Sequence, residues 1–102
     1  MEDIKIGNNI VISGFGDVEA DKKAVVNKMV SDYARRFQGQ CEKFQRLQVT
    51  MKGVHAEEKA HKFEINGKLL DNGRSYTSEV VDHDLLSSLD KALKKLENSV
   101  VR

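Results

Sequence analysis

Histidine side chains are the residues of this chain best suited to bind a transition metal or to transfer protons at neutral pH. There are three, His55, His61 and His83, separated by 6 and 22 positions. None forms the HxxxH or HExxH spacing that places two imidazoles on one face of a helix. We therefore expect surface or turn histidines, no metal site and no cofactor.

The single cysteine and a pair of glycines are the other candidates for chemistry. Cys41 precedes Glu42 and has no histidine within ten residues, so the sequence offers no base that would activate its thiol. The segment Gly14-Phe15-Gly16 lies between a predicted strand and a predicted helix but lacks the GxGxxG and GxxxxGK patterns of phosphate-binding loops. These features predict an inert cysteine, a plain turn, no small-molecule substrate and no enzyme.

Lysine and arginine at helical spacing remain, and their chemistry is the binding of anions. Projected at about 100° per residue, Lys28 and Arg35 lie almost above one another on the solvent side of a predicted helix. If a second helix lies on the same side of a sheet, its cations extend this group into one patch that suits a phosphate backbone. The alternative is that these side chains only keep the helix exteriors soluble. The predicted patch consists of Lys23, Lys28, Arg35, Arg36, Lys91, Lys94 and Lys95.

Two segments have the apolar periodicity of amphipathic helices. The first extends from Val18 to Phe37, with Asp17 as the expected N-cap and Gly39 as the expected stop. The second follows a cap at Asp82 or Asp84 and has a leucine-rich stripe that continues to residue 100.

Alternating apolar and polar residues predict four strands. They cover 9–15, with a frayed start at 3–6, then 44–54, 60–70 and 74–82. An acidic turn at 55–58 separates the second strand from the third, and Asp71-Asn72-Gly73 predicts a tight hairpin between the third and the fourth.

The element order β-α-β-β-β-α predicts an α+β fold with two layers. Each strand offers one apolar face, so we expect a four-stranded, mostly antiparallel sheet with both helices on one side, as in double-stranded-RNA-binding domains. The other side of the sheet would be polar and carry Arg46, Gln48, Thr50 and Lys52. We expect residues 1–102 to form a single domain.

Composition limits the cellular setting. The 102 residues include 17 Lys and Arg against 16 Asp and Glu, a net charge of +1 that argues against a strongly basic protein. Residues 35–62 are the basic part, with a net charge of +4. The sequence lacks a membrane-spanning run and a secretion signal, and a lone cysteine fits a reducing compartment. These features predict a cytoplasmic protein without a membrane partner.

Several local patterns resemble the ribosome hibernation-promoting and ribosome-associated inhibitor family. The clearest covers residues 80–98, VVDHDLLSSLDKALKKLEN, although Leu86 stands where the family often has an aromatic residue. The aromatic pair Tyr33 and Phe37 and the stretch FEINGKLL are also similar to the family. The matching features of the last helix are Asp84 at its start, Ser87-Ser88, Leu89-Asp90 and Lys95-Leu96.

This resemblance implies a non-enzymatic RNA-binding protein that associates with the small ribosomal subunit and silences or stabilises idle ribosomes. In the family, basic residues of both helices contact rRNA, so the seven cations named above become the candidate rRNA contacts. Because the sequence ends at Arg102, we expect the short form of the family, without the dimerisation domain of longer members.

Two alternatives remain open. One is a general double-stranded-RNA-binding module without a ribosomal role, although the Lys-Lys-x-x-Lys opening of such a module's last helix is missing at residues 83–88. The other is a small homodimeric interaction protein in which the hairpin of residues 60–82 extends a sheet across two copies.

Overall fold

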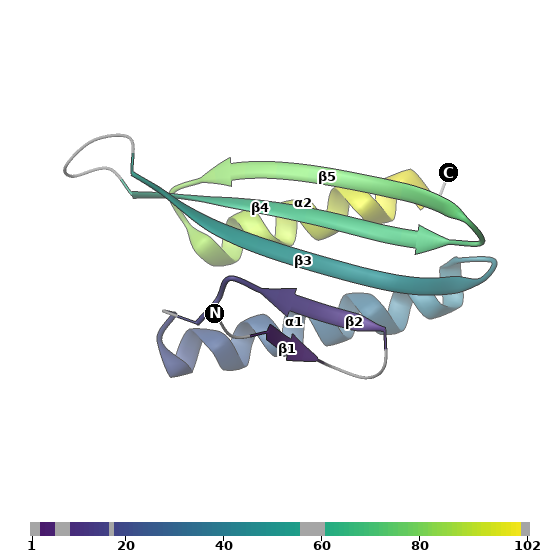
Figure 1. Cartoon of the computed structure of the whole chain (residues 1–102), viewed down its shortest axis with the longest axis horizontal. Coiled ribbons are helices and arrows are strands. Elements are labelled where there is room, and N and C mark those ends of the chain that lie inside the picture. Colours follow the sequence, from purple (N-terminus) through teal and green to yellow (C-terminus); the bar gives the residue numbers. More distant parts are fainter. Residues whose placement is uncertain (1–2, 6–8, 17, 56–60, 101–102) are drawn as a thin grey trace.

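The computed structural model describes residues 3–5, 9–16, 18–55 and 61–100, which form one sheet and two helices (Figure 1). Along the chain the elements are β1 (Asp3–Lys5), β2 (Ile10–Ser13), α1 (Ala20–Gln40), β3 (Phe44–His55), β4 (His61–Asp71), β5 (Arg74–Asp82) and α2 (Leu85–Val100).

The sheet has the spatial order β1-β2-β3-β4-β5. Strands β2 and β3 run parallel because α1 carries the chain back between them, whereas all other neighbours are antiparallel. The predicted α+β architecture is therefore confirmed. One detail differs, because residues 3–5 do not fray from the first main strand but form a short fifth strand that pairs with β2.

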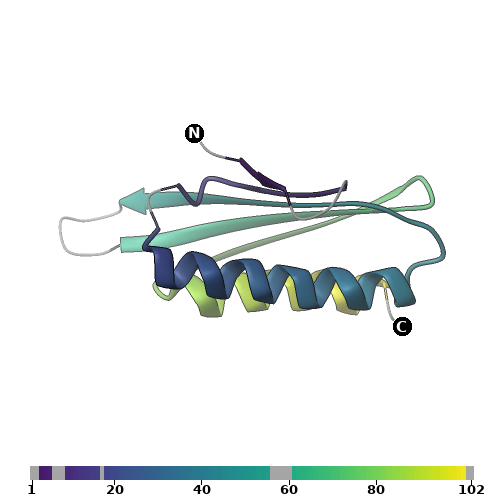
Figure 2. The same ribbon diagram turned by 90° about the horizontal axis from the view of Figure 1, so that it is seen from below.

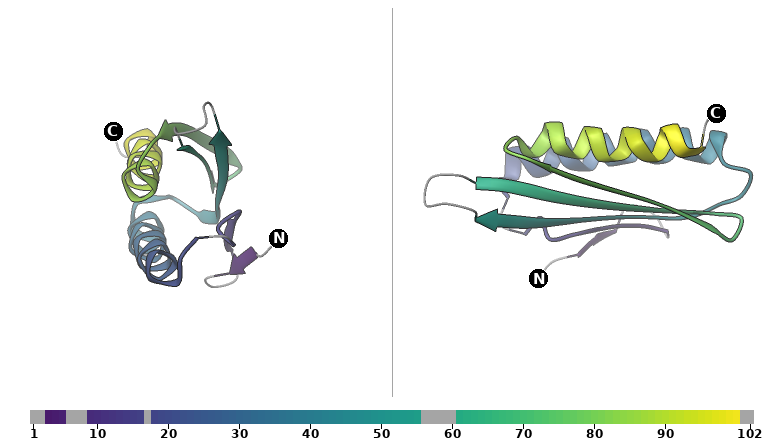
Figure 3. Two further views of the ribbon diagram at one scale, coloured as in Figure 1. Left: turned by 90° about the vertical axis from the view of Figure 1, so that its left-hand side faces the viewer. Right: turned by 90° about the horizontal axis from the view of Figure 1, so that it is seen from above.

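Both helices cover the same face of the sheet, and no other element that the structure describes covers β3, β4 and β5 on the opposite face (Figures 2 and 3). Apolar side chains fill the space between the layers, including Val49 and Ile65 from the sheet, Phe37 from α1 and Leu93 from α2, all fully buried. The open face is polar as predicted, with Arg46 and Lys52 exposed and Gln48 and Thr50 half-buried.

The first helix is shifted relative to the prediction. It begins at Ala20 rather than Val18, and Glu19 at its N-cap makes no capping hydrogen bond with its side chain. The expected cap, Asp17, lies outside the described residues. Gly39 does not stop the helix, which continues to Gln40 and ends where Cys41 turns to an extended backbone while donating its N–H to the Phe37 carbonyl, at 2.8 Å.

The predicted cap and hairpin are confirmed. The Asp84 carboxylate accepts the Ser87 N–H at 2.8 Å, which places a side-chain acceptor on an otherwise unpaired donor at the start of α2. Asn72 and Gly73 adopt φ values of 51° and 84°, the left-handed conformation that a two-residue hairpin requires. Of the predicted acidic turn at 55–58, residues 56–58 lie outside the described residues. No helix in the described part of the chain is long and apolar enough to cross a membrane.

Among the five glycines whose surroundings the structure describes, Gly14 most strictly excludes a side chain. Its φ is +87°, and a Cβ there would lie 2.1 Å from the Met51 carbonyl oxygen of β3. The turn between β2 and α1 can therefore press directly on the sheet.

We expect Gly14→Ala to lower the free energy of unfolding by at least about 1–3 kcal/mol, because both the backbone conformation and the contact become strained. Gly39→Ala is the matched control, since a Cβ there meets nothing within 4 Å and a helical alanine stabilises by about 0.5–1 kcal/mol. Urea unfolding of both variants tests this, and equal stability of the two would contradict it.

Candidate nucleic-acid interface

The helical layer has a net positive charge, whereas the rest of the chain has a net negative charge. Together α1 and α2 carry eight Lys and Arg against four Asp and Glu, whereas the rest of the chain carries nine against twelve. The helices lie side by side (Figure 3), so the two sets of cations belong to one layer of the domain. A near-neutral total therefore conceals a basic layer.

On α1, Lys28 and Arg35 project into solvent, with 79% and 78% of their side chains exposed. Asp32 lies between them and is 3.6 Å from a nitrogen of each. Exposed pairs of this kind contribute only about 0–1 kcal/mol, so the two cations remain available to an external anion.

A polar seam joins the two helices, formed by Tyr33, Arg36 and Gln40 of α1 with Asp90 and Glu97 of α2. The Tyr33 hydroxyl donates to Asp90 at 2.9 Å, and Gln40 donates to Glu97 at 3.0 Å. The Arg36 guanidinium lies 4.0 Å from the centre of the Tyr33 ring and 3.7 Å from Glu97. Arg36 is therefore bound within the seam, and the two carboxylates lie between the cations of α1 and those of α2.

The lysines of α2 divide into two groups. Lys91 and Lys95 lean toward β5, where Lys91 contacts the Asp82 carboxylate at 2.7 Å and Lys95 donates to the Glu79 carbonyl at 3.3 Å. Lys94 is exposed and forms no ion pair with another described residue. Lys94 is consequently the lysine of this helix that is most available to a partner.

The contact between Asp82 and Lys91 also sets their protonation. Hydrogen bonds from Lys91 and from the backbone N–H groups of His83 and Asp84 lower the pKa of Asp82, and the same carboxylate raises the pKa of Lys91. Both side chains are therefore charged at neutral pH. Acid breaks the pair by protonating Asp82, and this requires a pH below the one at which an ordinary aspartate is protonated.

The structure therefore divides the predicted patch rather than presenting seven equal cations. Lys28, Arg35 and Lys94 point outward, and Arg36, Lys91 and Lys95 are held by neighbours. Lys23 is half-buried and takes part in an interaction within the protein. In helical projection it lies about 140° around the axis of α1 from Lys28. Lys22, exposed in the first turn of α1, was not among the predicted residues, although its place in the helical segment was visible in the sequence.

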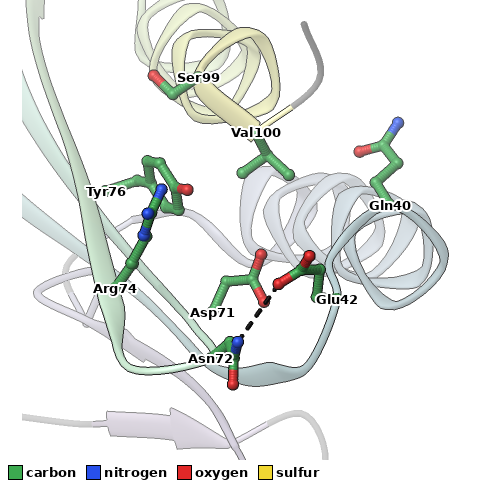
Figure 4. Close-up of a pocket in the computed structure, with 8 residues that line it drawn as sticks. All are labelled: Gln40, Glu42, Asp71, Asn72, Arg74, Tyr76, Ser99 and Val100. Carbon is green, nitrogen blue, oxygen red and sulfur yellow. Dashed lines mark hydrogen bonds between the residues drawn. The ribbon is translucent and has the colours of Figure 1, made fainter.

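A polar crevice of about 370 Å³ lies at the hairpin end of the domain (Figure 4). Its groups hold the turn after α1 against the β4–β5 hairpin: buried Asp71 accepts the Lys43 N–H at 2.8 Å, and Asn72 donates to Glu42 at 3.3 Å. We assign these residues a structural role. Within the described ranges, no three His, Cys, Asp or Glu side chains gather as a metal site would need.

Cys41, next to this crevice, has the properties of an unreactive thiol. Burial, together with the charge and hydrogen bond of Asp71, raises its pKa from 9.0 to about 11. Hardly any thiolate is present at neutral pH, so the group is a poor nucleophile.

We expect Cys41 to react with iodoacetamide at pH 8 about 100-fold more slowly in the folded protein than in urea, because two pKa units change the thiolate fraction by that factor. Mass spectrometry of timed samples measures both rates. Equal rates would contradict the buried environment, and Asp71→Asn is expected to raise the rate in the folded protein, because it removes the negative charge beside the thiol.

Tyr33→Phe tests the seam. Loss of the hydrogen bond to Asp90 should lower the free energy of unfolding by about 0.5–1.5 kcal/mol. Burial and then the Asp90 carboxylate raise the pKa of Tyr33, so the unfolded chain ionises first and stability falls as pH rises above about 10.

The Phe variant should lose less stability over that alkaline range, which urea unfolding at pH 7 and pH 10.5 would show. A wild-type protein and a Phe variant with the same pH dependence would contradict the assignment.

Two solved structures share the fold of this chain. A ribosomal subunit interface protein from Coxiella burnetii aligns with a TM-score of 0.62 and 13% identity, covering 90% of each chain. The N-terminal domain of Protein Y from Thermus thermophilus aligns with a TM-score of 0.54 and 21% identity, covering 90% of this chain and 91% of that one. No curated protein sequence matches the chain.

A family model provides the assignment that these low identities cannot. It matches residues 10–102, which include both helices and the strands β2 to β5. The resemblance to the hibernation factors is thereby confirmed. The chain belongs to the family described as Sigma 54 modulation protein / S30EA ribosomal protein.

Proposed function

We propose that this domain binds rRNA of the small ribosomal subunit through the outer side of its helical layer and so silences or stabilises idle ribosomes. The family consists of non-enzymatic, ribosome-associated factors, which supports the ribosome as the partner and the cytoplasm as the location. That the bound component of the ribosome is RNA is our inference from the positive charge of the two helices.

The observation that carries the proposal is the excess of four positive charges on two helices that lie side by side. Phosphate groups are the abundant anions of a ribosome, and each one neutralised by Lys or Arg releases condensed counterions. Lys28 and Arg35 on α1 and Lys94 on α2 are the proposed principal contacts. Lys23, Arg36, Lys91 and Lys95 are proposed to add to the field around them.

The seam between the helices supports this arrangement. Asp90 is bound by the Tyr33 hydroxyl and Glu97 by Arg36 and Gln40, so both carboxylates have partners within the protein. Their hydrogen bonds also fix the helices relative to one another. A rigid arrangement of cations loses less conformational freedom when it binds RNA.

The experiment is sedimentation of the protein with small ribosomal subunits over a range of salt concentrations. Arg35→Gln with Lys94→Gln removes one proposed contact from each helix without touching the Lys91–Asp82 pair, whose loss would disturb the start of α2. We expect the slope of log affinity against log salt to become shallower by about 1.4–1.8, because each phosphate contact contributes about 0.7–0.9.

Lys43→Gln with Arg74→Gln is the matched control, since it removes two exposed positive charges at the hairpin end that belong to none of the proposed contacts. The control is expected to keep the wild-type slope. Equal slopes for all three proteins would reject the helical face. Binding of plain duplex RNA as tightly as of the subunit would instead favour the double-stranded-RNA-binding alternative, and a dimer by light scattering with no ribosome binding would favour the interaction protein.

A further inference from the structure

The polar side of the sheet is a second surface that the helical interface does not use. Figure 1 looks straight onto it, with both helices behind, and none of the described elements lies in front of β3, β4 and β5. Alternate residues of β3, β4 and β5 point outward there, and the register places Gln48 beside Lys68 and Lys68 beside Thr77.

Two adjoining hollows lie on this face. One, of about 140 Å³, is lined by Arg46, Gln48, Lys68 and Leu70. The other, of about 260 Å³, shares Gln48 and Lys68 and continues across the strands to Thr50, Asn66 and Thr77. Because they share two lining residues, the hollows form one shallow track across three strands.

The charge of this track is positive. Neither hollow is lined by a carboxylate, and neither Arg46 nor Lys68 forms an ion pair with a residue that the structure describes. The acidic residues of this face lie outside the two hollows. Glu64 accepts a hydrogen bond from the Asn66 amide at 2.8 Å and lies opposite Lys52 in the register. Glu79 is diagonal to Lys68, and no ion pair joins these two side chains in the structure.

The lining chemistry favours the backbone of a nucleic acid over a protein. Protein interfaces are anchored by aromatic side chains, and bases of single strands stack on them, but this track has none. Guanidinium, ammonium, amide and hydroxyl groups are instead the groups that contact phosphate and sugar oxygens. Arg46 and Lys68 are diagonal neighbours on adjacent strands, about 7–8 Å apart at Cα.

We propose that the outer sheet face is a second RNA-binding surface, in which Arg46 and Lys68 bind backbone phosphates and Gln48, Thr50 and Thr77 contact sugar or phosphate oxygens. This inference rests on the proposed ribosome binding and extends it. The helical face and the sheet face point in opposite directions across the shortest dimension of the domain, 18 Å between Cα extremes. The domain therefore lies between two RNA segments rather than against one.

Arg46→Gln with Lys68→Gln tests the sheet face, using the same salt-dependent sedimentation and the same Lys43→Gln with Arg74→Gln control. Both residues are exposed, so the fold is expected to tolerate the changes. We expect the slope to become shallower by about 1.4–1.8 relative to wild type and control. Combined with Arg35→Gln and Lys94→Gln, the two losses should add, because the faces share no contacts.

The outcomes separate this inference from the proposed function. A wild-type slope for the sheet-face variant together with a reduced slope for the helix variant overturns the second surface and leaves the proposed function standing. A reduced slope for the sheet-face variant alone supports the second surface and rejects the helical one. No sedimentation of the wild-type protein overturns both.

A photoreactive residue at Gln48, in the centre of the track, identifies the partner directly. Crosslinks to rRNA in complexes with the small subunit are expected. Crosslinks from position 48 to ribosomal proteins alone would overturn the assignment of RNA to this face. The absence of any crosslink from position 48, when the same photoreactive group placed at Lys94 does crosslink, would overturn it as well.

Discussion

The apolar side of the sheet is the surface against which both helices must pack, and the rest of the molecule follows from it. Strands β3, β4 and β5 place their buried side chains on that side only, among them Val49, Ile65 and Val80. Two amphipathic helices can bury their stripes together only by lying next to one another there. Their charged sides then form a common surface, and the other side of the sheet stays exposed.

The side-by-side packing also creates the polar seam. Tyr33 is almost fully buried, yet its hydroxyl reaches Asp90, 57 positions away in the chain. The same seam takes up Arg36 and Glu97. Each helix thus packs apolar side chains against the sheet and polar side chains against the other helix. Its remaining polar side chains point outward into solvent.

Most of the fold was predictable from the sequence because local patterns determined it. Alternation located β3, β4 and β5, the Asn72-Gly73 turn set the hairpin, and Asp84 marked the start of α2. The boundaries of α1 were less accurate, because Gly39 can remain helical when the following backbone supplies the stop at Cys41. Pairing of residues 3–5 with β2 depends on a contact between strands that no single segment reveals.

The candidate site was predictable only in part, for the same reason. A helical projection gives the direction of a side chain but not what it meets, so it could not show that Lys91 would contact Asp82 or Arg36 would contact Glu97. It also could not join Arg46 to Lys68, which are brought together by the register of β3 and β4. Separating the outward cations from the held ones required the tertiary structure.

The position of Asp32 between Lys28 and Arg35 has a consequence for how the protein would leave its partner. When phosphates withdraw, this carboxylate is already in place to receive both cations, so neither is left without a counter-charge. Exchange between the internal and the external anion changes the free energy little, since each exposed pair is worth only about 0–1 kcal/mol. Attachment built on such exchanges is readily reversible, which suits the proposed binding to idle ribosomes.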